Sequence, residues 1–335
     1  MAPHSNADVA PASTTDTSSG KTWEPHANTD QTALEALSQG PTLPGIPKFP
    51  SYHKHRTHIL EHMAATFRIF ARKGFNEGLA GHISVRDPEN LHTFWTNPLG
   101  RPWQLMRASD MILVDYGGNA VGGNMLLPSN AAGFQIHSAL HKARPDVNAA
   151  CHAHTIYGKA WATFGRPLEM INQDACIFYG RAQAVYEDFG GVVFDEEEGK
   201  RLAASLGPEG KVMTLANHGL LTVGHTVDEA AYLFTLMEKS CQVQLLAEAA
   251  AANGIPKRII EDKVAAYTFK MTSSPDSLYF HQEPVEADLN GLFQRLGSRY
   301  ETWPDNATID EREVDLLLLE RFKTKKSLFN VGLQD

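Results

Sequence analysis

Residues 144–155 read Arg-Pro-Asp-Val-Asn-Ala-Ala-Cys-His-Ala-His-Thr, a short apolar run that ends in two histidines. Pro145 ends the helical pattern that precedes it, and Val147–His152 has the length and composition of a buried strand. Side chains two residues apart in a strand share a face, so His152 and His154 are predicted to point the same way. That spacing is typical of two ligands to one metal ion. It also fits solvent-facing or hydrogen-bonded core histidines.

A third histidine strengthens the metal interpretation. His218 lies between Asn217 and Gly219, in a predicted tight turn that follows a second predicted strand, Val212–Leu215. There it could point into a cleft at the end of the sheet. Three neutral imidazoles with an open coordination position suit catalytic Zn²⁺, and the ligand type also admits Fe²⁺ or Mn²⁺. The alternative for His218 is a turn residue that only satisfies backbone groups.

The rest of this region alternates between helical and strand periodicity. Helices are predicted within 52–75, over 131–143, around 157–164 and from Thr226 to about Gly254, where Thr226 and Glu229 form a capping-box pattern. Strands are predicted at 82–85, 92–96, 111–114, 147–152, 212–215 and 219–223. We therefore expect an α/β protein, a single three-layer α/β/α domain.

The two ends of the chain have a different composition from this middle. Residues 1–48 are rich in Ser, Thr, Ala and Pro and are predicted to form a flexible N-terminal arm. The domain is expected to span 49–255. Residues 256–335 form a more polar C-terminal extension, with a terminal helix around Leu316–Leu319.

Composition and charge exclude several classes of function. The 335 residues include 30 Lys and Arg against 39 Asp and Glu, and their net charge of −9 argues against nucleic acid as the main partner. No stretch approaches the ~20 apolar residues of a membrane span, and the first residues lack the pattern of a secretory signal. Three cysteines without a C-x-x-C pair suit a reducing compartment. We expect a cytoplasmic protein that acts on a small molecule.

Five stretches, in this order and spacing, resemble the class II aldolase/adducin family between His55 and Gly254. They are Gly81–Arg86, Thr96–Gly100, Ala132–Ala139, Arg144–Thr155 and Asn217–Leu220. The resemblance implies an α/β/α fold on a mainly antiparallel, nine-stranded sheet. It also implies a homotetramer with active sites between neighbouring subunits.

The same resemblance assigns the histidines a role. It implies that His152, His154 and His218 hold a divalent metal, which polarises substrate oxygens and stabilises an enediolate while a carbon–carbon bond breaks. A Lewis acid can supply several kcal/mol of stabilisation to such a charge, and an enolate formed by decarboxylation would benefit equally.

Two differences from the sugar-phosphate aldolases narrow the range of expected substrates. Those enzymes carry an acid/base glutamate four residues before the histidine that matches His137, and this chain has Gly133 there. Their phosphate-binding loops are also altered here, at 81–84, 97–100 and 129–130. Both changes resemble the adducin-like branch, although adducin heads lack the full set of metal histidines. A sugar phosphate is therefore not the expected substrate.

Loop residues at these places are the candidates for substrate binding: His82, Asn97 and Ser129, with turn stabilisation as the alternative for each. Arg86 could pair with a substrate carboxylate. A structural ion pair with Asp87 or Asp115 is the alternative for Arg86.

Proton transfer needs a replacement for the missing glutamate. Tyr179 follows the metal strand in a region where family members bring polar groups to the site, so its hydroxyl is the candidate proton donor. A packed aromatic is the alternative. His137 is expected to support the site from behind rather than to bind the metal.

Together these features predict a metal-dependent carbon–carbon lyase that acts on a small oxygenated acid, by decarboxylation or retro-aldol cleavage. Two alternatives remain open at this point. One is an Fe²⁺-dependent oxygenase on the same histidines, and the other is a non-catalytic adducin-like assembly module.

Overall fold

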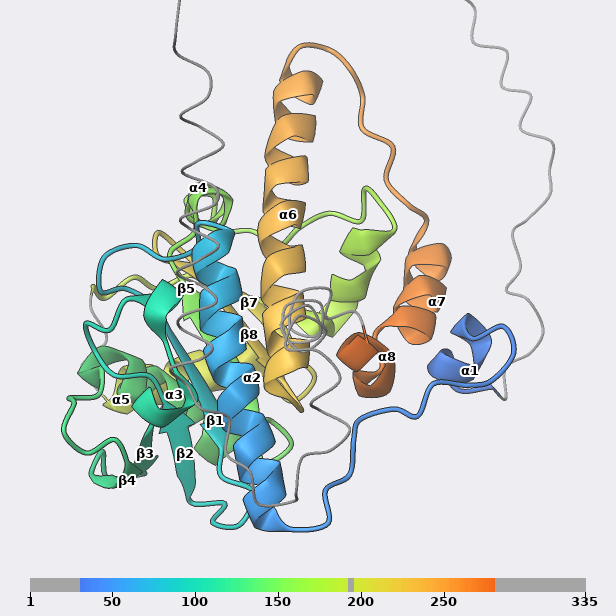
Figure 1. The fold of residues 1–335 in the computed structure, drawn as a ribbon. Coiled ribbons are helices and arrows are strands. Elements are labelled where there is room, and N and C mark those ends of the chain that lie inside the picture. The colour runs from blue at the N-terminus through green and yellow to red at the C-terminus, as the bar shows by residue number, and fades with distance from the viewer. Residues whose placement is uncertain (1–30, 192–195, 281–335) are drawn as a thin grey trace, which may run out of the picture.

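A single sheet organises the part of the chain that the structure, a computed structural model, describes: residues 31–191 and 196–280. Its strand order is β4-β3-β2-β1-β5-β8-β7-β6 (Figure 1). The strands are β1 His82–Arg86, β2 Thr93–Thr96, β3 Ile112–Asp115, β4 Ala120–Gly123, β5 Ala149–Ala153, β6 Gln183–Tyr186, β7 Val212–Leu215 and β8 Gly219–Gly224.

All neighbouring strands pair antiparallel except β6 and β7, which run parallel. The expected mainly antiparallel α/β architecture is thus confirmed. The described residues contain eight strands of this sheet and not the nine that the resemblance implied.

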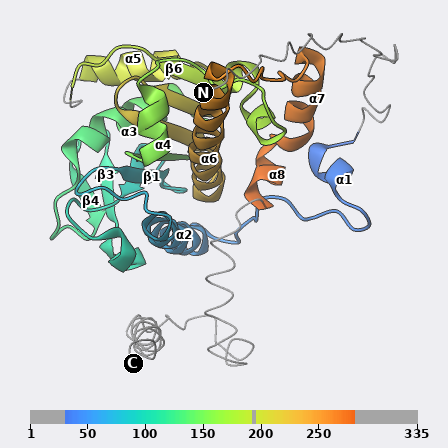
Figure 2. The same ribbon diagram turned by 90° about the horizontal axis from the view of Figure 1, so that it is seen from above.

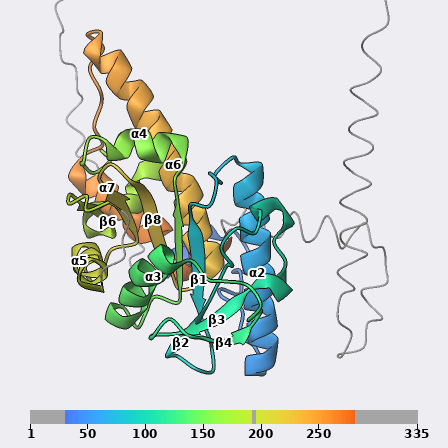
Figure 3. The same cartoon turned by 90° about the vertical axis from the view of Figure 1, so that its left-hand side faces the viewer.

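Helices cover both faces of the sheet. They are α1 Ala33–Leu37, α2 Tyr52–Arg72, α3 Ala131–Ala143, α4 Ile156–Ala162, α5 Glu196–Leu206, α6 Val227–Ala252, α7 Asp262–Thr272 and α8 Pro275–Phe280. Figure 3 shows α2 and α3 on opposite sides of the sheet. No helix within the described residues is both long enough and apolar enough to cross a bilayer.

Strand alternation divides the apolar core between the two faces. Cys151 and Ala153 of β5 belong to the larger buried cluster with α2 and α6, whereas Ala150 belongs to the cluster with α3 and α5. Because successive side chains of a strand point to opposite faces, His152 points to the α3 and α5 side together with Ala150. This parity decides on which face each histidine cluster lies.

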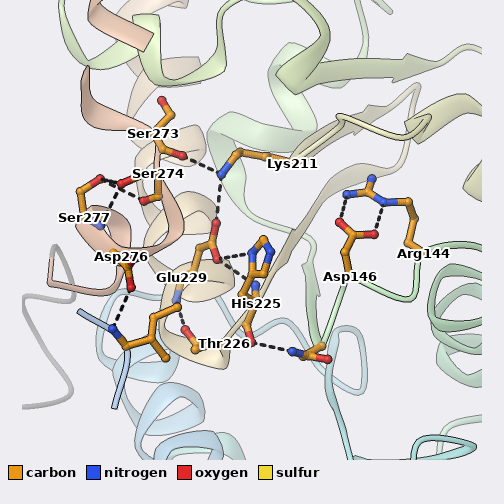
Figure 4. Close-up of polar contacts among 12 residues, drawn as sticks. Arg144, Asp146, Lys211, His225, Thr226, Glu229, Ser273, Ser274, Asp276 and Ser277 are labelled. Carbon is orange, nitrogen blue, oxygen red and sulfur yellow. Dashed lines mark hydrogen bonds and ion pairs between the residues drawn. The ribbon is translucent and has the colours of Figure 1, made fainter. Parts of the chain in front are cut away.

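Helices α7 and α8 follow α6 and pack beside α1 (Figure 2). Lys211 holds them to the domain, because its Nζ donates to the Glu229 carboxylate at 3.1 Å and to the Ser273 carbonyl at 2.8 Å (Figure 4). Asp276 accepts a hydrogen bond from the Ile46 backbone N–H at 2.9 Å. The predicted helix around Leu316–Leu319 and the first 30 residues of the predicted arm lie outside the described residues.

Candidate metal centre

Three histidines converge where two neighbouring strands meet. His152 lies in β5 and His154 directly follows it, while His218 occupies the turn between β7 and β8. Since β5 and β8 pair antiparallel, with Ala153 opposite Leu220, the end of β5 lies beside the beginning of β8. One ring nitrogen from each histidine lies within 4.8 Å of the others. The structure thus brings together the three residues that the sequence proposed as ligands.

The protonation state of these imidazoles fits a metal. The Nδ1 of His152 donates to the Leu220 carbonyl at 2.8 Å, which leaves the Nε2 lone pair facing Nε2 of His154 at 3.1 Å. Burial lowers the pKa of His152 well below its usual range, and it also lowers the pKa of His154. Burial lowers the pKa of His218 to about 4. Metals bind neutral imidazole, so the donor set matches a divalent transition metal.

The centre is open on one side. His152 is buried, whereas His154 and His218 are partly exposed. A small pocket lined by Tyr186 of β6, by Phe189 in the segment after it and by residues of α5 and β7 borders His218. An open side is what distinguishes catalytic from structural histidine sites.

Glu238 of α6 fixes the chain directly after His154. Its buried carboxylate accepts hydrogen bonds from the Thr155 hydroxyl and from the backbone N–H groups of Tyr157 and Gly158, the latter two at 3.0 and 2.7 Å. An anion at the N-terminus of α4 satisfies donors that the helix itself leaves free. Glu238 was not among the sequence candidates, because it lies far along the chain in an apolar helix.

Asn217 gives the turn its shape. It is the only described residue other than glycine with a positive φ, at 55°. In this left-handed conformation its N–H donates to the Ala162 carbonyl at 3.0 Å, and that of His218 donates to the Leu215 carbonyl at 3.0 Å. Asn tolerates the conformation better than most residues. The backbone therefore turns sharply enough to bring the His218 ring back toward β5.

His82 occupies the space beside the triad that Gly133 leaves open. Its ring centroid lies 4.8 Å from that of His152. A Cβ built on Gly133 would stand 2.5 Å from Cδ2 of His82, closer than packed atoms approach. No other residue type therefore fits at position 133 unless the His82 ring moves.

A chain of hydrogen bonds runs from His82 into the protein. His82 Nδ1 lies 2.7 Å from His137 Nε2, His137 Nδ1 lies 2.5 Å from Ser84 Oγ, and Ser84 Oγ lies 2.8 Å from His141 Nε2. His141 Nδ1 reaches the Val147 carbonyl at 3.3 Å. A carbonyl only accepts, so His141 Nδ1 donates, and with neutral rings every later donor in the chain is determined. The chain leaves Nε2 of His82 as an acceptor.

Burial supports this assignment of protons. It lowers the pKa values of His82 and His137 well below their usual range, and it lowers the pKa of His141 to about 3. Both ring nitrogens of His137 form hydrogen bonds, one with His82 and one with Ser84. This arrangement matches the predicted position of His137 behind the site. His141 was not among the sequence candidates; its place one helical turn after His137 was the available signal.

The structure places Arg86 away from the triad, as a structural residue. Its Nη2 donates to the carbonyl oxygens of His141 and Val147 at 2.7 and 3.0 Å. The predicted alternative was an ion pair between Arg86 and Asp87. Asp87 instead pairs with Arg56, with 2.7 Å between Arg56 Nε and Asp87 Oδ2. The bonds to backbone carbonyls count against a substrate carboxylate at Arg86, and its substrate-binding role stays a prediction.

Asn97, Ser129 and Tyr179 have surroundings that differ from the predicted ones. Asn97 is buried, and its amide oxygen accepts from the Ile83 N–H at 3.2 Å, which is turn stabilisation. Ser129 pairs through its backbone with the residue after Asn97. The Tyr179 hydroxyl bonds to Asp262 of α7, which raises the pKa of Tyr179, and its ring lies 6.4 Å from that of Phe269. Tyr179 as proton donor stays a prediction.

The layered α/β/α domain thus carries, at its strand ends, three histidines that could hold a metal ion. The family model for the Class II Aldolase and Adducin N-terminal domain matches residues 61–245, and the chain belongs to this family. The family assignment that the sequence resemblance implied is thereby confirmed.

Similar proteins extend this assignment. Decarboxylase NovR of Streptomyces niveus is 44% identical over 64% of this chain and 77% of its own length. A Streptomyces roseochromogenus subsp. oscitans protein, 4-hydroxy-3-prenylphenylpyruvate oxygenase/4-hydroxy-3-prenylbenzoate synthase, is 44% identical over 64% of this chain and 76% of its own. Among solved structures, L-fuculose 1-phosphate aldolase from Glaciozyma antarctica PI12 is 42% identical with a TM-score of 0.67, and the match covers 75% of this chain and 95% of that one. With these relatives, the chain is an enzyme of the lyase type.

Proposed function

We propose that this protein is a Zn²⁺-dependent carbon–carbon lyase that cleaves a small oxygenated acid by decarboxylation or retro-aldol reaction. The observation that carries the proposal is the convergence of His152, His154 and His218 as neutral donors on an open side of the domain. The names of the decarboxylase and aldolase relatives support the reaction class.

The chain's own groups divide the work at this centre. A divalent cation held by the three imidazoles would supply electrophilic stabilisation for negative charge on a substrate oxygen. His82 contributes Nε2 as a fixed acceptor, aligned through the hydrogen bond from its Nδ1 to His137. A substrate hydroxyl beside the triad would donate to this nitrogen. His82 is thus the substrate-binding candidate that the structure favours most.

Charge at the rim supports an acidic substrate. Lys159 of α4 lies close enough to His154 for its charge to lower the pKa of that histidine, although burial is the larger cause. Lys159 forms an exposed ion pair with Glu77. Such a pair is weak in water and can open when a substrate carboxylate competes for the lysine.

The same geometry counts against a phosphate cradle of the sugar-phosphate aldolase kind. Asn97 uses its amide on the Ile83 N–H and the Pro98 carbonyl. His82, the first residue of β1, stands where those enzymes have a smaller polar residue and uses its Nδ1 on His137. His82 therefore has no free donor for a phosphate, and Asn97 has one amide hydrogen left.

An Fe²⁺-dependent oxygenase on the same three histidines is the second candidate, and the oxygenase name of one relative favours it. Three imidazoles with open positions also suit iron. Oxygen consumption coupled to turnover separates the two candidates. The lyase predicts equal turnover with and without oxygen.

We also propose that the protein works as a cytoplasmic homotetramer with active sites between neighbouring subunits. The proposal rests on the family, and such an assembly would give Tyr179 a role. Bonded to α7 within its own subunit, Tyr179 would act at the site of a neighbour. Light scattering on the full chain of 36.9 kDa tests the assembly.

The decisive experiment for the function is a metal-and-activity assay on the full chain. The protein is stripped with chelator, reloaded with Zn²⁺ or Fe²⁺, and assayed with 2-hydroxy, 2-keto and 3-hydroxy acids and with a sugar phosphate. We expect acid cleavage by the Zn²⁺ form, its loss in His154→Ala, and its retention in the control His92→Ala, at an exposed histidine. Full activity in metal-free protein, or turnover of the sugar phosphate alone, would overturn the proposal.

A further inference from the structure

A second group of metal-ligating side chains lies apart from the triad. His58 and His62 are on α2, and Asp228 is the second residue of α6. His62 Nδ1 lies 2.8 Å from Asp228 Oδ1, the centroids of the two imidazole rings are 3.7 Å apart, and one ligand atom from each of the three residues lies within 4.8 Å of the others. We propose that this group is a second divalent-metal site, separate from the proposed reaction centre.

The two groups lie on opposite faces of the sheet. Cys151 of β5 packs in the cluster formed with α2 and α6, and its neighbour His152 points to the other face. Val227 and Ala230 of α6, which flank Asp228, pack in this same cluster, so Asp228 lies on the Cys151 side. A metal bound by Asp228 therefore cannot be the metal bound by His152.

The ligand spacing is built into the helix. His58 and His62 are four residues apart, so both rings emerge from the same side of α2, one above the other. The Cα of each lies in regular helix, and α6 supplies the third ligand from its first turn. One ion bound here would thus link α2 to α6.

An independent observation points to a missing cation. Asp228 is 1% exposed, and its Oδ2 has no hydrogen-bond partner anywhere in the described residues. A buried carboxylate oxygen without a partner is costly, and such atoms call for an unseen ion or water. The histidine beside Asp228 uses only the other oxygen. A cation between the two helices would give Oδ2 its partner.

Arg56, two residues before His58, does not occupy the place of a cation at this site. Arg56 binds Asp87 and Glu89 and so does not neutralise Asp228. His55 is one turn before the first ligand on α2 and stacks on Phe49, with ring centroids 4.6 Å apart.

The donor set identifies the class of ion. Two imidazoles and one carboxylate suit Zn²⁺ or Co²⁺ with one or more water ligands. Ligand atoms of a tetrahedral zinc site lie about 3.4 Å apart, given bonds of about 2.0–2.1 Å. The present ligand atoms lie within 4.8 Å of one another, so metal binding requires the half-buried His58 ring, which packs against Phe49, to move closer.

The test counts metal ions per chain in the full-length protein. Apo-protein is titrated with Zn²⁺ in a calorimeter and, after removal of free metal, measured by elemental analysis. We expect two Zn²⁺ per chain in the wild type and one in His154→Ala. His58→Gln should also retain one, and the double variant should retain none. His55→Gln, on the same helix, should retain two.

Folding and site identity are checked in the same variants. Zn²⁺ should raise the Tm of His154→Ala by several degrees and leave the Tm of the His154→Ala/His58→Gln double variant unchanged. Asp228→Asn should also lose one ion. No Zn²⁺ in His154→Ala, or the same Zn²⁺ count in His58→Gln as in the wild type, would overturn the proposal. Because His58 is half-buried, its substitution leaves the fold intact even if Asp228→Asn does not fold.

Discussion

The His82 ring stands where a side chain on Gly133 would begin, with Cδ2 of His82 2.5 Å from the position of a Cβ on Gly133. The sugar-phosphate aldolases that this chain resembles carry an acid/base glutamate at the position of Gly133. In this chain a neutral imidazole packs against the glycine at that position. The consequence is an acceptor nitrogen beside the triad that the buried chain through His137 holds in one orientation.

The steric pairing gives a double-mutant test. Gly133→Ala should destabilise the protein by about 1–3 kcal/mol, as overpacking does, because the His82 ring must move. In the His82→Ala background the same change should cost much less, and the coupling is the difference between the two costs. Urea unfolding of the four proteins measures it. Equal costs in both backgrounds would show that the two residues do not compete for this space.

Glu238 should control metal affinity without touching the metal. Glu238→Gln weakens three hydrogen bonds at the start of α4, directly after His154. Supporting residues of this kind change metal affinity by about 10–100-fold, and we expect weaker Zn²⁺ binding at the triad by that factor. The control is Glu248→Gln, at a partly exposed residue of the same helix. Unchanged affinity in Glu238→Gln would contradict the supporting role.

The left-handed turn at Asn217 makes a third prediction. Asn217→Ala should cost about 1–2 kcal/mol of stability, the penalty for a Cβ residue at positive φ. Asn217→Gly should be nearly neutral, because glycine adopts this conformation freely. Thermal unfolding of both variants is the measurement. If alanine were tolerated as well as glycine, the φ of 55° would not be a constraint on the turn.

The cluster of Lys211, His225 and Glu229 predicts the pH dependence of stability (Figure 4). Burial raises the pKa of Glu229, but hydrogen bonds from His225 and the charge of Lys211 outweigh it, so the net pKa is lowered. The hydrogen bond to Glu229 raises the pKa of His225.

The sign of each effect follows from linkage. Glu229 stabilises the fold above its unfolded pKa of about 4.5, and this contribution is lost as the pH falls through its lower folded pKa. Protonated His225 stabilises the fold below about pH 6.5, and this contribution is lost as the pH rises through its raised pKa. His225→Gln should therefore lose most stability, relative to wild type, below pH 6.5. A constant difference from pH 5 to 9, measured by urea unfolding, would refute this coupling.

Sequence periodicity predicted the elements that carry strong local signals. The helix over 131–143 and the strand over 212–215 occur with the predicted bounds. Pro145 marks the end of that helix, and the strand is a continuous apolar run. In contrast, β6 was not predicted, because Gln183–Tyr186 is short and half-buried and owes its strand to parallel pairing with β7.

The residues of the candidate site also divide into those with a local sequence signal and those without one. The metal triad could be proposed because His152 and His154 are adjacent in a strand and His218 lies in a marked turn. The positions of Arg86 and Tyr179 depend on contacts with distant segments, namely α3 and α7. Glu238 gave no signal, since its partners are about 80 residues away in the sequence. Local pattern thus predicts donors at strand ends, and only the fold shows what supports them.

The proposed reaction centre is one metal ion held by three imidazoles. Anomalous diffraction at the zinc edge from crystals of the Zn²⁺-loaded full chain would locate that ion. We expect a peak about 2.0–2.1 Å from one nitrogen each of His152, His154 and His218, with at least one position taken by water or substrate. No peak between these rings, or a fourth protein ligand that closes the site, would contradict it.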